Sequence, residues 1–281
     1  PMNTQAAWLP GFNLDELPEI QEVSLPAAAG DYETAAGWLA ETSRVLVKVG
    51  GGARKAGHKV KKFLEIVGGV LVHTPIATGC IPYSDPCNMT VGGSKGSLCG
   101  NYAMENPDLL VAIGTRAVCQ SDCSRTGYPN VKHVININTG VEDATHYNKS
   151  LSFVGDASRT LEKLIETVSG KCIPNPDWLS SCIMKKEKWQ RLKEERFKNP
   201  VLDDDYWGGK VLTQPAAIKI AVDWARSRGA VCFFDAGDVQ ANGFQIVEDE
   251  EPGQTITETG ASYMDLRSML SSPLGLVPIL I

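Results

Sequence analysis

The chain has 281 residues, of which 43% are hydrophobic and 21% are charged, a composition typical of an ordinary globular protein. Its formal net charge of -6 argues against a basic surface for nucleic acid or anionic lipid. No apolar run reaches the roughly 18 residues that span a bilayer, and the opening PMNTQAAWLP lacks the basic and apolar regions of a signal peptide. We expect a cytoplasmic protein that acts on a small-molecule substrate, with neither nucleic acid nor a membrane as its partner.

Apolar runs of strand length alternate with segments of helical spacing in the first part of the chain. Helical spacing occurs at residues 31–42, 55–66, 97–105 and 157–168. Strands are predicted at residues 45–49, 70–74, 108–114, 131–138 and 150–154, and a long polar loop follows the second of them. This alternation predicts parallel βαβ units, and therefore an α/β fold with a doubly wound parallel sheet.

A different pattern begins near residue 173. Asp177 is in position to cap a long helix rich in Lys and Glu, which we interpret as a solvated linker. Thr213 then caps a helix with Pro215 in its first turn, and a buried strand at 230–234 follows. The predicted organisation is an arm at 1–43, a sheet domain at 44–172, a linker helix at 173–204, and an incomplete second α/β unit at 205–281.

The eight cysteines include no C-x-x-C pair, the spacing on which zinc ribbons and thioredoxin-type redox sites depend. The four histidines do not form a metal-spaced set either. We predict reduced, mostly buried thiols and no metal ligands in the chain.

Two strand ends of the first domain carry residues suited to a ligand. Gly50, Gly51 and Gly52 follow the first strand, so the backbone there can approach a ligand and the next helix can point its N–H groups at an anion. Gly114 and Arg116 follow the third strand, at the end where doubly wound sheets bind ligands and where an arginine can pair with a phosphate. The alternatives are that the glycines form only a tight turn and that Arg116 serves a structural ion pair.

Two further strand ends are polar. Asn136 and Asn138 end the fourth strand, where an amide can bond a ribose hydroxyl, although Asn138 could equally serve only to form the turn before Gly140. The segment 235–240 follows the strand of the second unit and could face a diphosphate, or could be an ordinary βα loop.

Taken in order, these segments resemble the central domain of thiamine-diphosphate (ThDP)-dependent enzymes of the acetolactate synthase-like family. The resemblance rests on VLVKVGGGARKAG, GCIPYSDPCNMTVGGSKGSLCGNYAMENPDLLVAIGTR, NVKHVININTG and FVGDASRTLEKLIE. These match the family's Gly-rich turn, its G-x-I-P-x-x-(H/D)-P loop, its G-x-x-G-x-x-x-x-N-Y-A helix and its V-G-D-A helix start. Downstream, VLTQPAAIKIAVDWARSRGAVCFFDAGDVQANGFQ is similar to the start of the family's diphosphate-binding domain.

The resemblance implies a Rossmann-like central domain, an arm from a missing pyrimidine-binding domain, and a truncated diphosphate-binding domain. It implies ThDP and Mg²⁺ as cofactors of the parent enzyme, and a homodimer or tetramer as its assembly. The residues implied near the diphosphate of ThDP are Gly237, Asp238 and Gln240. If the central domain holds FAD or ADP, as in some relatives, the implied contacts are Gly50, Gly51, Gly52, Gly114, Arg116 and Asn138. Asn138 departs from the acidic residue usual at its position.

The family's catalytic glutamate lies in the pyrimidine-binding domain, and a G-D-G…N-N element binds its Mg²⁺; neither is in this sequence. We therefore expect no catalytic residue in the chain and no turnover by it alone. After Met264 the family has a helix that begins Met-Gly, whereas the chain continues DLRSMLSSPLGLVPILI. We hypothesise that residues 265–281 are out-of-frame sequence, which resequencing the gene would test.

These inferences favour a fragment of a ThDP-dependent lyase or transferase (synthase) that acts on a 2-oxo acid or a diketone. The alternative is a stand-alone FAD- or ADP-binding module without catalysis. An NAD-dependent deacylase shares the general sheet type but is disfavoured, because the paired C-x-x-C zinc ligands are missing.

Overall fold

The computed structural model describes residues 24–28, 31–257 and 279–280. The helices are α1 (Tyr32–Glu41), α2 (Gly57–Val67), α3 (Leu98–Glu105), α4 (Cys119–Asp122), α5 (Val141–Ala144), α6 (Ala157–Val168), α7 (Pro176–Lys198), α8 (Gln214–Arg226) and α9 (Asp238–Ile246). The strands of the first domain are β1 (Val45–Val49), β2 (Val70–His73), β3 (Asn88–Val91), β4 (Leu109–Ile113), β5 (His133–Asn138) and β6 (Ser150–Val154). Those that follow are β7 (Val201–Asp204), β8 (Gly209–Leu212), β9 (Cys232–Phe234), β10 (Thr255–Thr257) and β11 (Ile279–Leu280).

The first six strands form one sheet in the order β3-β2-β1-β4-β5-β6, and every neighbouring pair is parallel. The chain starts at β1 in the middle, winds outward to β3, and returns to β4 on the other side of β1. This confirms the predicted doubly wound α/β fold. Since the winding direction reverses between β1 and β4, their carboxyl ends form the switch point at which such sheets bind ligands.

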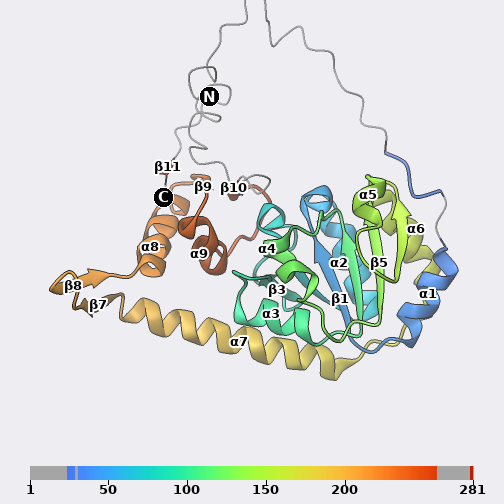
Figure 1. Ribbon diagram of the computed structural model, residues 1–281, viewed down its shortest axis with the longest axis horizontal. Coiled ribbons are helices and arrows are strands. Elements are labelled where there is room, and N and C mark those ends of the chain that lie inside the picture. The colour runs from blue at the N-terminus through green and yellow to red at the C-terminus, as the bar shows by residue number, and fades with distance from the viewer. Residues whose placement is uncertain (1–23, 29–30, 258–278, 281) are drawn as a thin grey trace, which may run out of the picture.

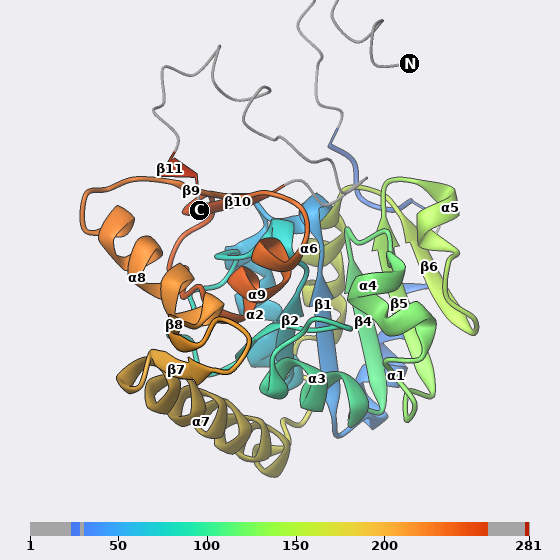
Figure 2. The same cartoon turned by 60° about the vertical axis from the view of Figure 1, so that its left-hand side comes forward.

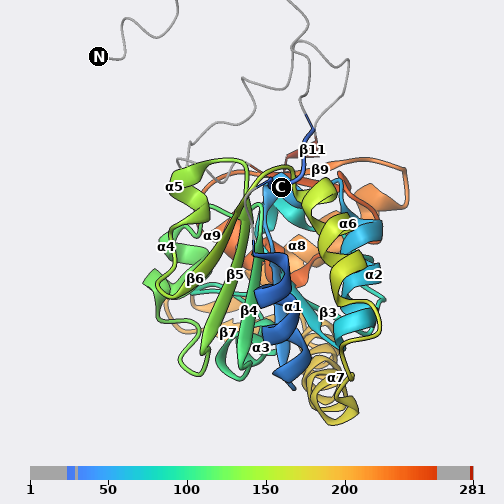
Figure 3. The same cartoon turned by 90° about the vertical axis from the view of Figure 1, so that its right-hand side faces the viewer.

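Helices cover both faces of this sheet (Figure 1). Helices α1, α2 and α6 pack together on one face, as Figure 3 shows. On β1, Val45, Val47 and Val49 point into the core of that face, whereas Leu46 belongs to the core built with α3 and α7. Strands β1 and β4 are buried along their whole length, which explains why their sequences are apolar except for Lys48 of β1.

Helix α1 lies outside the predicted sheet domain, whose boundary was placed at residue 44, yet it packs on α6. Asp31 caps it by accepting a hydrogen bond from the Thr34 N–H at 2.8 Å. Two other helices begin in the same way, α3 with Ser97 and α6 with Asp156 as the cap.

The structure corrects one prediction about α7 and extends another. Its cap is Asn175, which accepts a hydrogen bond from the Asp177 N–H at 3.0 Å, because Pro176 takes the first helical position. The helix is also more than a solvated linker, since Trp178, Cys182 and Lys193 are buried. The Trp178 indole donates to the Val45 carbonyl at 3.1 Å, which fastens the start of α7 to the central strand.

The segment predicted as a long polar loop contains the edge strand β3. Its sequence NMTV is short and half polar, so periodicity gave no signal. The polar side chains are satisfied locally: Asn88 donates to the Ile81 carbonyl at 2.9 Å, and Thr90 bonds Ser97 at 2.6 Å. Outside this sheet, the antiparallel pair β7–β8 was likewise not predicted.

The second unit runs through α8, β9, α9 and β10, with β10 and β11 pairing parallel to β9. Figure 2 shows α9 between α8 and the central sheet, with α7 running below them. Apart from β11, the hypothesised out-of-frame segment lies outside the described residues, as do residues 1–23 of the predicted arm.

The described residues also bear on the expectations for membrane-spanning helices and for cysteines. None of their helices combines the length and apolarity needed to cross a bilayer. Seven cysteines are free thiols, and five of these seven are buried.

Candidate functional site

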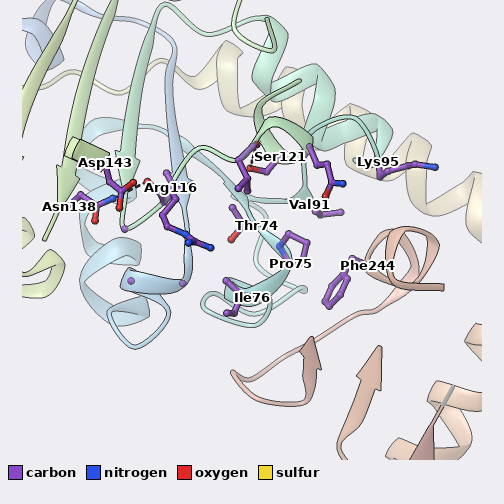
Figure 4. Close-up of a pocket in the computed structure, with 18 of the residues that line it drawn as sticks. Thr74, Pro75, Ile76, Val91, Lys95, Arg116, Ser121, Asn138, Asp143 and Phe244 are labelled. Carbon is purple, nitrogen blue, oxygen red and sulfur yellow. Dashed lines mark hydrogen bonds between the residues drawn. The ribbon is translucent and has the colours of Figure 1, made fainter. Parts of the chain in front are cut away.

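A cavity of about 360 Å³ opens at the switch point, where the carboxyl ends of β1, β2, β4 and β5 meet. Figure 4 shows residues from these strand ends on one side and Phe244 of α9 on the other. Seven of the nine predicted site residues line this cavity: Gly50, Gly51, Gly52, Gly114, Arg116, Asn138 and Gln240. We refer to it below as the switch-point pocket.

The glycine turn is shaped by close packing of the β1 and β4 ends. The Gly50 N–H donates to the Ile113 carbonyl at 2.9 Å, and the Gly52 N–H donates to the Gly114 carbonyl at 3.0 Å. A Cβ on Gly50 would lie 2.4 Å from the Gly114 oxygen, so only glycine fits. Gly114 itself has φ +59°, a left-handed conformation that favours glycine. The turn thus has a packing reason for its glycines besides any contact with a ligand.

Among the described residues of the pocket lining, Arg116 is a cation without an ion-pair partner. It follows β4, is exposed, and forms no ion pair or hydrogen bond with the described residues. Figure 4 shows its side chain extending into the space between the strand ends and Phe244. The alternative interpretation was that Arg116 forms a structural ion pair, but the described part of the chain offers it no carboxylate partner.

Asn138 ties the ends of β4 and β5 together. Its amide donates to the Thr115 carbonyl at 2.9 Å, and its Oδ1 accepts from the Thr139 N–H at 2.9 Å. Asn136 plays a similar part, because its amide donates to the Asp143 carbonyl at 2.7 Å. All three contacts are structural, so a hydroxyl ligand would have to compete with, or add to, the two hydrogen bonds that Asn138 already makes.

Thr74 was not singled out from the sequence. It follows β2, lines the pocket and is 6% exposed, and its Oγ1 has no hydrogen-bond partner in the described residues. Buried hydroxyls are almost always bonded, so a lone one beside a cavity indicates a place where a polar ligand atom would fit. The preceding His73 is buried, and this burial lowers its pKa to about 4, which leaves the ring neutral.

A buried ion pair supports the wall of the pocket formed by Val118, Gln120 and Ser121. Lys48 is fully buried in the middle of β1; its Nζ donates to the Ser121 carbonyl at 2.6 Å and lies 3.4 Å from Asp122. Burial lowers the pKa of Lys48, whereas the neighbouring Asp122 opposes that shift.

Asp122 is also fully buried and accepts hydrogen bonds from two phenols, those of Tyr128 and Tyr147. Burial, reinforced by Asp122, raises the pKa of Tyr128 well above its usual value. We call Lys48, Asp122, Tyr128 and Tyr147 the lysine cluster. A lysine inside an otherwise apolar strand was the signal in the sequence that could have identified it.

The second unit supplies the remaining wall through Gln240, Ala241 and Phe244 of α9. Gln240 is held in place by its amide, which donates to Thr257 at 2.6 Å. Gly237 and Asp238 lie outside the lining. Asp238 is exposed and faces Lys95 at 3.8 Å across the rim.

The turn at Gly237 has some, but not all, of the features that the diphosphate of ThDP requires. It has φ +98° with open space around it and precedes the N-terminus of α9, which suits an anion. Asp238 would repel the diphosphate unless a cation lay between them, and the described residues contain no cluster of His, Cys, Asp or Glu that could hold a metal. These residues therefore fit one end of the cofactor and do not complete its site.

The fold and the pocket define an α/β domain of the nucleotide-binding type, joined by a long helix to a second α/β unit. The family model described as the thiamine pyrophosphate enzyme central domain matches residues 32–164. Residues 32–164 thus match the central domain of ThDP-dependent enzymes, and the chain is similar to the acetolactate synthases.

The chain is 32% identical over 108 residues to the probable chloroplastic acetolactate synthase 2 of Oryza sativa, which is 38% of this chain and 15% of the rice protein. It is 22% identical over 261 residues to the chloroplastic acetolactate synthase 1 of Nicotiana tabacum, which is 91% of this chain and 36% of the tobacco protein. The acetolactate synthase 3 of Brassica napus is 22% identical over 257 residues, 91% of this chain and 37% of that protein. The chain thus spans at most 37% of the length of these three relatives.

Proposed function

We propose that the chain forms the central domain and the opening of the diphosphate-binding domain of a ThDP-dependent synthase or lyase that acts on a 2-oxo acid or a diketone. The observation that carries the proposal is the position of α9. This helix follows the turn at Gly237 and forms one wall of the switch-point pocket of a domain that matches the central domain of ThDP-dependent enzymes. Similarity to the tobacco acetolactate synthase over 91% of the chain, well past the family match, supports the same function.

The cofactor would supply the carbanion chemistry, and the role of the protein would be to hold and orient it. In this proposal the central domain is a rigid scaffold. Its switch point receives α9 and so fixes the direction in which the turn at Gly237 faces.

The test is the product of the complete transcript, assayed beside residues 1–281 alone. With ThDP and Mg²⁺, the complete product is expected to release CO₂ from pyruvate or to cleave a diketone, and residues 1–281 are expected to do neither. Sequencing the same transcript should reveal a pyrimidine-binding domain upstream and a Gly-Asp-Gly element downstream. An active product of residues 1–281, or an inactive complete product without these elements, would contradict the proposal.

A second candidate function is binding of FAD or ADP in the switch-point pocket. The observations that favour it are the Arg116 guanidinium and the Thr74 hydroxyl, which find no partner among the described residues and lie in one cavity beside the glycine turn. A guanidinium that faces a cavity without a carboxylate partner suits a phosphate.

For this second candidate, titration of residues 1–281 with FAD and with ADP is expected to give saturable binding of one of them. Arg116→Gln should weaken that binding about tenfold or more, because a charge-assisted hydrogen bond is lost. Arg159→Gln is the matched control, since Arg159 is an exposed arginine on α6, paired with Glu162 at 3.3 Å and remote from the pocket lining. Absence of binding to either nucleotide would exclude this candidate and would leave the ThDP proposal standing.

A further inference from the structure

The loop at residues 79–86, GCIPYSDP, matches the G-x-I-P-x-x-(H/D)-P loop of the family, and none of its residues lines the switch-point pocket. It packs instead against α7 and against the segment that follows α9. Gly79 has φ +81°, and a Cβ there would lie 2.2 Å from the Glu251 oxygen. The loop and the second unit are thus in direct backbone contact.

Tyr83 is the centre of this contact. Its N–H donates to the Asp249 carbonyl at 2.9 Å, and its hydroxyl donates to Gln190 of α7 at 2.6 Å. The ammonium groups of Lys186 and Lys193 lie 4.9 and 4.7 Å from the centre of its ring. Burial raises the pKa of Tyr83 above its usual range, so the phenol stays neutral.

Residues 248–250 complete the contact from the side of the second unit. Lys193, which is 4% exposed, donates to Tyr83 at 3.0 Å and pairs with Glu248 at 2.5 Å. The hydroxyl of Ser84 donates to Glu250 at 2.7 Å. We call this set of contacts the Tyr83 joint.

The Tyr83 joint lies close to the wall of the switch-point pocket that α9 forms. Helix α9 ends at Ile246, two residues before Glu248, and the same helix contributes Gln240 and Phe244 to the pocket. Apolar adhesion between the two parts is thin, because Val91 is the one residue of the central sheet in the buried apolar cluster of the second unit, among the described residues. Polar contacts therefore carry much of the attachment.

We infer that Tyr83 is a positioning residue. Its contacts hold the end of α9 against α7, and they thereby keep α9 in place as one wall of the switch-point pocket. The inference is independent of which ligand the pocket takes, so it can fail while the proposed function holds, and the reverse.

The test is hydrogen exchange, measured by mass spectrometry on wild type and three variants. Tyr83→Leu removes the ring and the hydroxyl, and it should speed exchange about tenfold in peptides of α9, with β4 and β5 unchanged. Tyr83→Phe keeps the ring between the two lysines and should give a smaller increase in the same peptides. If Tyr83→Leu does not fold, Tyr83→Phe still decides the matter.

Tyr102→Leu is the matched control. Tyr102 also places its ring against a lysine of α7, with Lys185 at 4.7 Å, but it lies on α3, and its ring interactions among the described residues are with Lys185 and Trp178 of α7. It should leave exchange in α9 unchanged. Unchanged exchange in α9 of both Tyr83 variants would overturn the inference, and so would an equal increase in α9 and the central sheet, which would indicate only a global loss of stability.

Discussion

A Gly50→Ala variant is expected to lose about 3 kcal/mol of unfolding free energy and to distort the switch-point pocket. The added Cβ would lie 2.4 Å from the Gly114 oxygen and 2.6 Å from the Thr115 Cα, and both are backbone atoms that cannot rotate away. The turn after β1 must then separate from the end of β4, and this breaks the bond from the Gly52 N–H to the Gly114 carbonyl. Urea unfolding followed by circular dichroism measures the loss.

Gly37→Ala is the matched control for this substitution. Gly37 lies on an exposed face of α1, and nothing is within 4 Å of its Cβ position. Since alanine is a better helix former than glycine, the unfolding free energy of this variant should rise by up to about 1 kcal/mol. If Gly50→Ala were as stable as wild type, the contact between the two strand ends would not have the role assigned to it.

A Lys48→Met variant is expected to lose about 3–5 kcal/mol of unfolding free energy, which is the usual result of removing one partner of a buried ion pair. Methionine matches the length of the lysine stem and leaves no large cavity. Asp122, however, is left fully buried without its cation, although it still accepts hydrogen bonds from Tyr128 and Tyr147. The wall of the pocket at Ser121 loses its bond to the central strand as well.

Two further variants separate charge from packing. In Lys48→Met with Asp122→Asn, the buried charge is gone and an acceptor remains for a phenol, so a large part of the lost stability should return. Lys95→Met removes an exposed lysine of the same pocket, whose partner Asp238 is also exposed, and should change stability by less than about 0.5 kcal/mol. A Lys48→Met variant as stable as Lys95→Met would refute the role of the lysine cluster.

The central sheet could be predicted because its strands follow a simple rule. A strand buried on both faces is expected to be apolar; β4 follows this rule along its whole length, and β1 follows it except at Lys48. Edge strand β3 could not be found in this way, because its polar residues interrupt the apolar pattern. Their hydrogen bonds are made to nearby residues, which the pattern does not show. The cap of α7 was misplaced for a related reason: several residues near a helix start can cap it, and the position of Pro176 decides between them.

The site was partly predictable. Strand ends are visible in a sequence, and parallel strands bring them to one edge, so seven candidate residues meet in one pocket. Gly237 and Asp238 lie outside it, because α9 turns toward the pocket only further along its length. The unbonded Thr74 and the Tyr83 joint depend on contacts between distant segments, which no local pattern in the sequence records.

Helix α7 also limits how the length of this protein can change in evolution. Its 23 residues would form a rod about 34 Å long, in which each residue advances the direction of the side chains by about 100°. Trp178 is fixed near one end and Lys193 near the other. Deleting a single residue between them would turn Lys193 away from Tyr83 while leaving Trp178 in place. Insertions and deletions should therefore be rare within this interval of homologous sequences and common in the turn between β7 and β8, where Gly208 has open space around it.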